Sequence, residues 1–553
     1  MFNFYAHFNV NRIMTVNENF LDSILIEVGE FGRYQRRICF LIFIATFISY
    51  FPSVVYVFET KQIDHRCEIP ECELVSSDFV PNWWQNAIPP DDDNNPSQCI
   101  RYRRISNNSH SCNASDFDRS VTESCDNYVY ETTEISIIQD FDLQCPENVW
   151  RLALVGTINS AGLFVGLPIA GILSDKFGRK AILIGTLGLS GVAGLIRSFT
   201  NSYIFFIVME FIEAAFGAGA YATAFVIGVE LVGPSKRILV GLLINAFYAL
   251  GGVFEGGMAW AFQSWRPLVQ LLYALPLLCI SYYWLVPESV RWLLNKKRHG
   301  EAQKILETLA KVNIRTISKE NLVKLCNEEE EEKFSDNAFK ELFRSIILLM
   351  RFVNCAFCWI AIVFVYNGLT INSVELSGNS YLDFILTIFV EIPGAIVAFL
   401  IVDRIGRRYT LATGFFISAF SCVGSIFMTQ DMYTLKLIIY LLGKFGISIN
   451  MCVIYSVTTE LFPTPLRNSL LSASSMFGRI GAMVAPQIPL LEATWKPLPL
   501  TLFAAMSLVA GFTSLLFPET MNIKLPDTIE QAENIGKLSK MRRSKDEMIS
   551  VIP

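Results

Sequence analysis

The segment LSDKFGRK at residues 173–180 returns in the second half of the chain as IVDRIGRR at 401–408. Both carry an acid, a glycine and two basic residues in the same order, and both lie between long apolar runs. Two more pairs of landmarks recur at the same separation of roughly 230 residues: Glu230 with Glu460 at the ends of apolar runs, and PES at 287–289 with PET at 518–520. Half of the chain therefore occurs twice. Duplicated membrane halves predict two helical bundles that move about a site between them.

The composition supports a protein that crosses a membrane many times. Hydrophobic residues make up 52% of the chain and charged residues only 17%, whereas soluble domains carry about 25% charged residues. A helix needs about 20 apolar residues to span a bilayer, and the apolar runs supply twelve candidates. They lie near 38–58, 149–173, 181–198, 203–228, 238–261, 267–286, 350–370, 381–402, 409–428, 433–457, 468–490 and 499–518.

The distribution of basic residues predicts the orientation of these spans. All the basic clusters fall on one side of a twelve-span arrangement, and the positive-inside rule makes that side cytoplasmic. Both termini are then cytoplasmic. The clusters are Arg33, Arg36 and Arg37; Lys176, Arg179 and Lys180; Lys236 and Arg237; the basic residues of 291–344; Arg404, Arg407 and Arg408; Arg467; and those of the tail.

The same arrangement divides the chain into parts. They are a cytoplasmic N-terminus at 1–37, a first six-helix bundle at 38–286 that includes an extracellular cysteine-rich loop at 59–147, a cytoplasmic loop at 287–345, a second six-helix bundle at 346–518 and a cytoplasmic tail at 519–553. Residues 1–37 contain no apolar core, so we do not expect a cleavable signal there. Their segment VNENFLDSILIEVGEFGRYQRR predicts a short amphipathic helix at the inner surface.

The loop at 59–147 has a chemistry of its own. It contains six of the thirteen cysteines: Cys67, Cys72, Cys99, Cys112, Cys125 and Cys145. It also contains two glycosylation sequons, which begin at Asn107 and Asn113. An extracellular loop favours three disulfides among fifteen possible pairings; a zinc site competes, but the ligand spacing is irregular. We expect the loop to form a small disulfide-linked domain that covers the extracellular end of the bundles. A homo-oligomer that forms through this loop is an alternative that we leave open.

Several classes of function lack their motifs. There is no G-x-x-x-x-G-K-[ST] loop for nucleotide phosphates, which argues against an ATP-driven pump, and no H-E-x-x-H or comparable metal cluster. None of the four histidines falls inside a predicted span, which excludes a histidine proton relay in the membrane. No serine pairs with a plausible base for hydrolysis. We therefore expect no enzymatic activity, no cofactor, no bound metal and no nucleic-acid partner.

The repeated motifs resemble those of a known family. LSDKFGRK and its second copy are similar to the signature loop of the major facilitator superfamily, and PESVRWLL narrows the likeness to sugar porters and organic ion transporters. The organic cation/anion/carnitine transporter family is indicated by the cysteine-rich loop, DFDLQC at 140–145, ELFPTPLRN at 460–468 and PETMNIKLPDTIEQAEN at 518–534. Residues 378–409 are closest to the organic cation transporter subgroup. The resemblance implies an all-α multi-pass membrane protein of twelve helices in two six-helix halves.

The charged residues of the motifs suggest a conformational latch. Acids and bases that pair in one state and separate in another can hold two bundles together reversibly, and the resemblance implies that role here. The alternative is static anchoring at the lipid headgroups. The latch candidates are Asp175, Arg179, Glu230, Glu288 and Arg291 in the first half, and Asp403, Arg407, Glu460 and Glu519 in the second. We expect Arg179 to reach Glu230, and Glu288 and Arg291 to share a face.

Charges inside the spans are the candidates for substrate binding, because they are expensive there and functional by default. They are Glu210, Glu213, Glu255, Asp383, Glu391, Lys444 and Arg479. Glu391 precedes Ile392-Pro393-Gly394, where a helix can break and expose backbone groups to a cavity. Glycines on both sides of Arg479 leave room for a ligand or a close helix. Aromatic side chains that could add cation–π or stacking contacts are Tyr221, Tyr248, Trp359, Tyr366 and Phe477.

The family resemblance points in two directions at this site. Cation-transporting members carry an aspartate at the position of Arg479, whereas anion- and carnitine-transporting members carry arginine. The anion- and carnitine-transporting members also carry a lysine where this chain has Ala218. Glu391 and Tyr366, however, match the cation subgroup, and Tyr221 stands where those members have a tryptophan. One positive and one negative group would suit a zwitterion such as a carnitine-like molecule, with its carboxylate at Arg479 and its ammonium near Glu391.

Three alternatives stay open. Arg479 could form a buried pair with Glu391 or Glu255. The chain could carry organic anions, with Arg479 and Lys444 as the anion site. It could also be a nutrient receptor derived from a transporter, although motifs in both halves argue for a cycling protein. The expected partners are a small organic ion and membrane lipid, with facilitated diffusion or exchange as the default coupling and the plasma membrane as the expected location.

Overall fold

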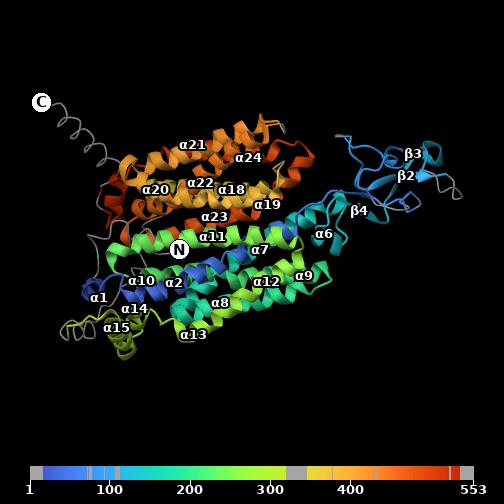
Figure 1. The fold of residues 1–553 in the computed structure, drawn as a ribbon. Helices are drawn as coiled ribbons and strands as arrows, with labels where there is room; N and C mark the ends of the chain where they lie inside the picture. The colour runs from blue at the N-terminus through green and yellow to red at the C-terminus, as the bar shows by residue number, and fades with distance from the viewer. Residues whose placement is uncertain are drawn as a thin grey trace.

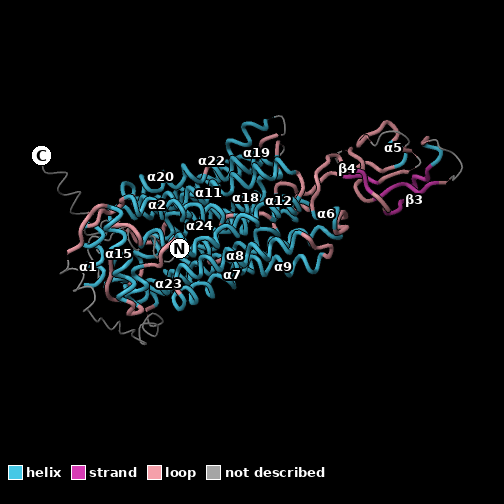
Figure 2. Tube along the Cα trace, turned by 60° about the horizontal axis from the view of Figure 1, so that its bottom comes forward, coloured by secondary structure: helices cyan, strands magenta, loops and turns pink. Residues whose placement is uncertain are grey.

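A computed structural model of the chain describes residues 16–70, 72–73, 78–91, 94–105, 112–318, 345–376, 378–429, 432–521, 523 and 525–535. Within these ranges almost all of the regular structure is helical, and the long helices run side by side in two bundles (Figures 1 and 2). Asn107, the first of the predicted glycosylation sites, lies outside the described residues; Asn113 is described and exposed.

The first bundle contains six spans, three of which are interrupted. They are α2 (Arg33–Ile48) continued by α3 (Phe51–Val54) and α4 (Tyr56–Glu59); α7 (Val149–Phe177); α8 (Arg179–Ser198); α9 (Tyr203–Gly217) continued by α10 (Ala220–Glu230); α11 (Arg237–Phe262); and α12 (Trp265–Leu278) continued by α13 (Tyr282–Leu285). The first interruption lies just before Pro52, which has no backbone N–H to donate and is therefore tolerated only in the first turn of α3.

The second bundle repeats the first. Its spans are α18 (Ile346–Asn372); α19 (Ser380–Phe389) continued by α20 (Glu391–Ile405); α21 (Arg407–Ile426); α22 (Tyr433–Leu461); α23 (Thr464–Val484); and α24 (Leu498–Ser514). Ten helices of the described chain are long and apolar enough to cross a membrane, and α24 is a shorter apolar helix. The remaining span, α23, is less apolar but 21 residues long, and it packs between α18 and α7. The break predicted at Glu391 separates α19 from α20.

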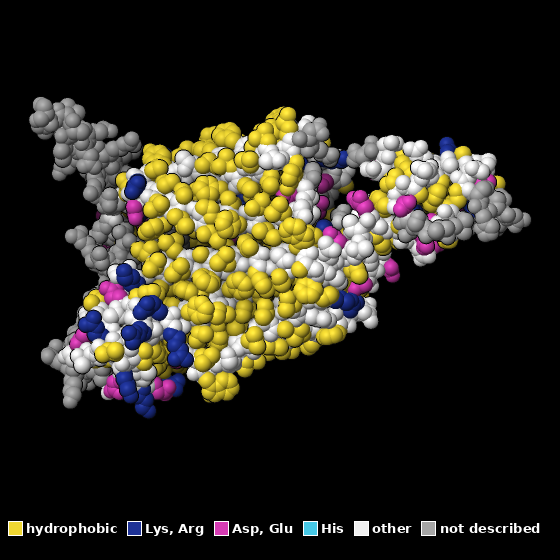
Figure 3. All heavy atoms as spheres, in the orientation of Figure 1, with side chains coloured by type: hydrophobic (Ala, Val, Ile, Leu, Met, Phe, Trp, Pro, Cys, Tyr) yellow, Lys and Arg dark blue, Asp and Glu magenta, His cyan; other side chains and the backbone are white. Residues whose placement is uncertain are grey.

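The outer surface of the bundles is apolar, as the long apolar runs of the sequence predict. On the face shown in Figure 3, hydrophobic side chains cover the helices in a broad belt, and lysines and arginines gather at one end. Large apolar side chains such as Trp284, Phe420 and Leu278 are mostly exposed. Contiguous exposed apolar surface of this extent is what a lipid-facing protein requires.

The cysteine-rich loop forms a small β module. Strand β1 (His65–Cys67) pairs antiparallel with β4 (Tyr128–Tyr130), and β2 (Ile100–Arg104) pairs with β3 (Phe117–Ser124). The six cysteines predicted to form disulfides do so, as Cys67–Cys125, Cys72–Cys112 and Cys99–Cys145. Figure 1 shows the module extending away from the bundles. We call the end of the bundles that carries it the loop end, and the opposite end, which carries motifs 173–180 and 401–408, the motif end.

At the motif end the N-terminal helix packs against the helices that follow the first bundle. The helix α1 (Val16–Glu27) places Leu21, Ile24 and Leu25 in a small apolar core with α14 (Val290–Asn295) and α15 (His299–Asn313). Its Asp22 pairs with Arg291 at 2.9 Å and contacts Arg237 of α11. The amphipathic helix predicted from 16–37 is therefore shorter, because Arg33 already begins α2, and its apolar face covers protein.

The two bundles touch at the loop end. The ring of Phe58 stacks on Tyr381 at 5.8 Å and meets Phe384 at 4.7 Å, so the first span contacts α19. The hydroxyls of Thr157 and Ser160 on α7 donate to the carbonyl oxygens of Met483 and Ala482 on α23, each at 3.0 Å. These contacts form a layer that closes the space between the bundles at this end, and we call it the loop-end seal.

We predict that Gly166→Ala destabilises the first bundle. A Cβ at Gly166 on α7 would lie 2.0 Å from the carbonyl oxygen of Ala215 on α9, so the two helices would have to separate. Overpacking of this kind costs about 1–3 kcal/mol, and the melting temperature of the purified protein in detergent should fall. The control is Gly171→Ala on the same helix, where a Cβ meets nothing within 4 Å. Equal melting temperatures for the two variants would contradict this packing.

Candidate functional site

A cavity of about 440 Å³ lies between the two bundles. Both halves of the chain contribute to it, through the segment after α2, α3, α4, α7, the end of α9, α10 and α11 on one side and α18, α20, α22 and α23 on the other. Its wall is strongly aromatic. The aromatic residues are Tyr50, Tyr56, Tyr221, Tyr248, Trp359, Tyr366 and Tyr455. A volume of this size and an apolar lining with a few polar groups are typical of small-molecule sites.

The cavity extends from the middle of the bundles towards the motif end. Among its lining residues, Leu239 lies in the first turn of α11 and Leu471 in the second turn of α23, and both helices begin at the motif end. The loop-end seal closes the other side. At the motif end, the ion pairs of Arg179 and Arg407 lie within their own bundles. The structure therefore has its cavity on the motif-end side of the seal.

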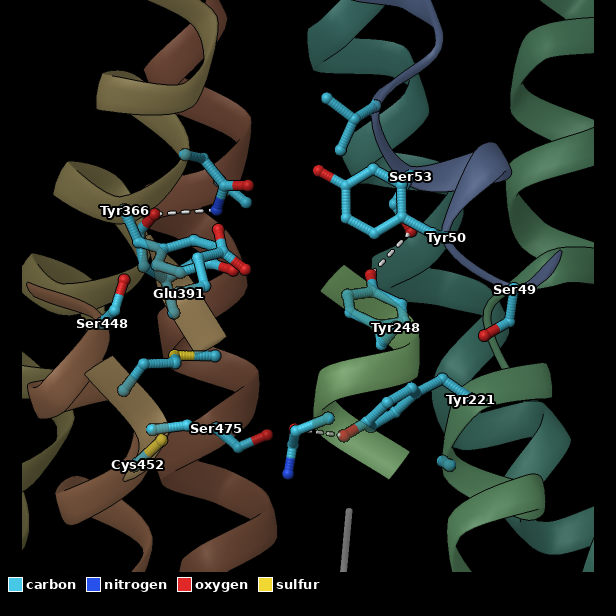
Figure 4. A pocket seen from close by; sticks show the side chains of 18 of the residues that line it. Ser49, Tyr50, Ser53, Tyr221, Tyr248, Tyr366, Glu391, Ser448, Cys452 and Ser475 are labelled. Carbon is cyan, nitrogen blue, oxygen red and sulfur yellow. Dashed lines mark hydrogen bonds between the residues drawn. The ribbon is translucent and has the colours of Figure 1, made fainter. Parts of the chain in front are cut away.

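The wall formed by the first bundle is a connected set of tyrosines (Figure 4). The rings of Tyr50 and Tyr248 meet at 4.9 Å, and those of Tyr221 and Tyr248 at 4.7 Å. The hydroxyl of Tyr221 donates to Asn245 at 2.7 Å, and that of Tyr248 donates to Ser53 at 3.4 Å. Sequence reasoning proposed Tyr221 for this site but missed Tyr50 and Asn245, because one tyrosine or asparagine in an apolar run does not show which way it points.

Glu391 faces this wall from the second bundle, beside Tyr366 (Figure 4). Its Oε1 lies 2.9 Å from Nζ of Lys444, and its side chain is 10% exposed. Lys444 is completely buried behind it; its Nζ lies 3.4 Å from the centre of the Tyr366 ring and donates to Thr370 Oγ1 at 2.7 Å. Of the five predicted binding residues, Glu391, Tyr366, Tyr221 and Arg479 line the cavity, whereas Lys444 holds Glu391 from outside the lining.

Arg479 lines the cavity from α23 and is half-buried. Within the described part of the chain it forms no ion pair, so neither Glu391 nor Glu255 neutralises it. The flanking glycines serve a helix contact, not a ligand: a Cβ at Gly481 would lie 2.5 Å from the carbonyl oxygen of Ile360 on α18. Close packing of α23 on α18 thus fixes the backbone from which Arg479 reaches the cavity.

The other charges inside the spans lie outside the cavity lining. Asp383 accepts a hydrogen bond from Tyr433, and Glu210 and Glu213 contact Arg197. Arg197 was missed by the sequence analysis, although a basic residue at the end of the apolar run 181–198 was a usable signal. Over the described ranges, no group of three or more His, Cys, Asp or Glu side chains could hold a metal ion.

Each motif contains a glycine that joins two helices, and a glutamate caps the second of them. Gly178 has φ +110° and Gly406 has φ +98°, conformations that side-chain-bearing residues rarely adopt. Glu288 accepts hydrogen bonds from the backbone N–H of Arg179 at 2.9 Å, and Glu519 from that of Arg407 at 3.0 Å. A carboxylate at a helix N-terminus is stabilised by unpaired N–H groups and by the helix dipole.

The remaining latch candidates pair within their own bundle. Arg179 pairs with Asp175 at 2.9 Å, while Glu230 accepts a hydrogen bond from Ser289. In the second half, Arg407 pairs with Asp403 at 2.8 Å and with Glu460 at 3.1 Å. The expected pairing of Arg179 with Glu230 is thus replaced by one within the motif. Arg291 pairs with Asp22 of α1 at 2.9 Å.

Comparisons with known proteins give a consistent result. The sequence pattern of the family described as "Sugar (and other) transporter" matches residues 97–531. The organic cation transporter protein of Drosophila melanogaster is 32% identical over 537 residues, covering 95% of this chain and 97% of that protein. Solute carrier family 22 member 3 of Mus musculus and member 2 of Homo sapiens are also 32% identical, each over 96% of this chain and over 98% and 97% of their own lengths.

The fold has solved counterparts. A partially occluded inward-open conformation of the xylose transporter XylE from E. coli superposes with a TM-score of 0.58, covering 88% of this chain and 99% of XylE at 13% identity. At this identity the likeness concerns the arrangement of the helices alone.

We predict that Arg407→Gln destabilises the second bundle strongly. Arg407 and Glu460 are 5% and 6% exposed, and removing one partner of a buried pair costs about 3–5 kcal/mol. The melting temperature should fall, and the double variant Arg407→Gln/Glu460→Gln should recover part of the loss, because it leaves no buried unpaired charge. Arg404→Gln, an exposed arginine of the same motif, is the control. A melting temperature for Arg407→Gln equal to that of the control would contradict the pairing.

Proposed function

Because this chain belongs to the sugar (and other) transporter family of the major facilitator superfamily, and within it to the organic cation, anion and carnitine transporters, we propose that it moves small zwitterionic organic ions across a membrane. It is a multi-pass secondary transporter, and its relatives are not enzymes. The proposal concerns its substrate: a molecule that carries both an ammonium and a carboxylate, such as a carnitine-like compound or a betaine.

The observation that carries this proposal is the presence of opposite charges on one cavity wall. Arg479 offers a guanidinium that no described carboxylate neutralises, and its planar donors suit a carboxylate. Glu391 offers a carboxylate on the same cavity, held in place by Lys444. Tyr248 lines the same cavity as both groups. Tyrosine faces around the cavity add cation–π attraction for an ammonium group, which strengthens where water is excluded.

The same pair of residues gives an organic anion as the second candidate. Lys444 already compensates Glu391, so Arg479 is the uncompensated charge of the described lining. A negatively charged aryl carboxylate would restore neutrality and stack on the tyrosines. A cation without a carboxylate fits less well, because it would share Glu391 with Lys444 and meet the positive charge of Arg479.

Transport would follow from alternation between two bundle arrangements. In the present one the cavity lies on the motif-end side, and the aromatic and hydrogen-bond contacts of the loop-end seal hold the other side closed. We propose that the second arrangement opens the seal and brings the two motif ends together, where the charged residues of 173–180 and 401–408 act as the latch. The basic residues of the motif end favour a cytoplasmic location for it, which puts both termini inside and the β module outside the plasma membrane.

Uptake measurements with three labelled probes test the substrate class. We predict that oocytes expressing the protein accumulate carnitine or a betaine, and that Arg479→Gln or Glu391→Gln lowers this uptake about tenfold or more. The reason is that one charge-assisted hydrogen bond contributes about 1.5–3 kcal/mol. Uptake of a quaternary ammonium should not fall in Arg479→Gln, because this substrate has no carboxylate that could bind Arg479. Lys311→Gln, which removes an exposed lysine of α15, should change nothing.

The amount of each variant at the cell surface normalises these rates. Zwitterion uptake that is unchanged in Arg479→Gln would contradict the two-charge site. If only an aryl carboxylate is carried, and Arg479→Gln abolishes it while Glu391→Gln does not, the anion proposal replaces the zwitterion.

A further inference from the structure

A second cluster of charges is buried inside the first bundle, away from the cavity lining. Its centre is Arg197 near the end of α8. The guanidinium lies 2.8 Å from Oε1 of Glu59 and 3.3 Å from Oε2 of Glu213, and it contacts Glu210. These four residues are 0% exposed, and we call them the Arg197 cluster.

Neutral side chains hold the cluster in a fixed arrangement. The hydroxyl of Tyr273 on α12 donates to Glu213 at 2.7 Å, and Nδ2 of Asn159 on α7 donates to Glu210 at 2.8 Å. Asn159 also donates to the carbonyl oxygen of Pro52 at 2.9 Å, which ties the cluster to the broken first span. The cluster and its hydrogen-bond partners therefore connect the first four spans to the sixth. The four charged residues are fully buried.

The charges of the cluster do not balance. One guanidinium faces three carboxyl groups, so full ionisation would leave two uncompensated negative charges buried inside the first bundle. Burying one unpaired carboxylate costs far more than binding a proton to it. At least one carboxyl group of the cluster must therefore be protonated when the bundle is packed as it is here.

Glu255 adds a fourth carboxyl group to the same region. It projects from α11, is 0% exposed, and neither of its oxygens has a hydrogen-bond partner among the described residues. No described cation forms an ion pair with it. The carboxyl groups of Glu59 and Glu213 are its acidic neighbours in the interior of the first bundle.

The titratable groups on the helices around α11 do not compensate Glu255. The first span contributes Tyr50, Tyr56 and Glu59, and α12 contributes Tyr273. Tyr221 on α10 donates to Asn245. On the other bundle, Asp383 of α19 accepts from Tyr433, and Glu391 of α20 pairs with Lys444. Tyr248 of α11 itself donates to Ser53. Each of these groups is neutral, acidic or engaged elsewhere.

The place of Glu255 on α11 connects it to the seal. Its neighbours Gly252 and Gly256 pack against α19: a Cβ at Gly252 would lie 2.9 Å from Ile388, and one at Gly256 2.9 Å from Phe384. When the loop end opens, α19 must leave this surface. A separation there would admit water beside α11 and remove the low-dielectric surroundings that exclude a charge from Glu255.

We propose that Glu255 and the Arg197 cluster form a proton-binding site, in which the Glu255 carboxylate takes up one proton as the loop end closes and releases it as the loop end opens. The reaction is the reversible addition of a proton to a carboxylate oxygen and needs no other reactant. By linkage, acid stabilises the closed seal, and a rise in pH shifts the population towards the open loop end. This inference does not depend on which organic ion the cavity binds.

Infrared difference spectroscopy on the purified full-length protein tests the proton directly. A protonated carboxyl group absorbs at a frequency of its own, distinct from a carboxylate. At about pH 5, above the ordinary pKa of glutamate, the protein should show a carboxylic-acid band that Glu255→Gln weakens. The part of the band that belongs to Glu255 should decline towards about pH 9, as the loop end opens and the proton is released. Glu147→Gln, an exposed glutamate at the loop end, is the matched control and should leave the band unchanged.

Spin labels at Phe262 of α11 and Leu382 of α19, both exposed, measure the opening of the loop end. Their distance should lengthen as the pH rises in the otherwise unchanged protein. In Glu255→Gln, which resembles the protonated acid, it should stay short at every pH, while Glu255→Asp should keep the dependence. Since Glu255→Gln replaces the buried neutral acid by a neutral amide of similar size, it should fold about as well as the parent. A carboxylic-acid band and a pH profile unaffected by Glu255→Gln would overturn the proposal.

Discussion

The close contact of α11 with α19 at the loop end is the constraint on which the rest of the structure depends. Gly252 and Gly256 let the two helices approach until the side chains of Ile388 and Phe384 touch the backbone of α11. This contact joins the bundles at one end and leaves the cavity on the other side of the seal. The aromatic stack of Phe58 and Tyr381 and the hydrogen bonds between α7 and α23 reinforce the same layer.

The two bundles differ in how far their buried carboxyl groups are paired with cations. In the second bundle Lys444 compensates Glu391, and Arg407 compensates Glu460. In the first bundle a single arginine, Arg197, faces three glutamates, with a fourth nearby. The duplicated halves have thus kept the same frame of helices and the same glutamate caps at the motif glycines, while their interiors have diverged electrostatically. Buried carboxyl groups that exceed the number of neighbouring cations are stabilised in their protonated, neutral form.

Much of the fold could be predicted from the chain. The repeat of 173–180 at 401–408 indicated two halves, and the apolar runs gave twelve spans close to those observed. Interruptions within the spanning helices were harder to predict, but Glu391 and Pro393 indicated the one between α19 and α20. The family prediction is confirmed by relatives that are 32% identical over nearly the whole chain. The even number of cysteines in one loop predicted three disulfides, although only the packed β module selected their pairing among the fifteen possibilities.

The sequence by itself determined what depends on neighbours along the chain: the length of apolar runs, the acid and glycine of each motif, and the presence of charges inside spans. The tertiary structure decided which charges meet. Lys444 and Glu391 come from different helices, as do Arg197 and Glu59, so their pairing follows from helix rotation and crossing, which no local pattern encodes. The same reason left Arg479 facing the cavity and turned its flanking glycines to α18, since a helix presents each residue to the side that packing with its neighbours selects.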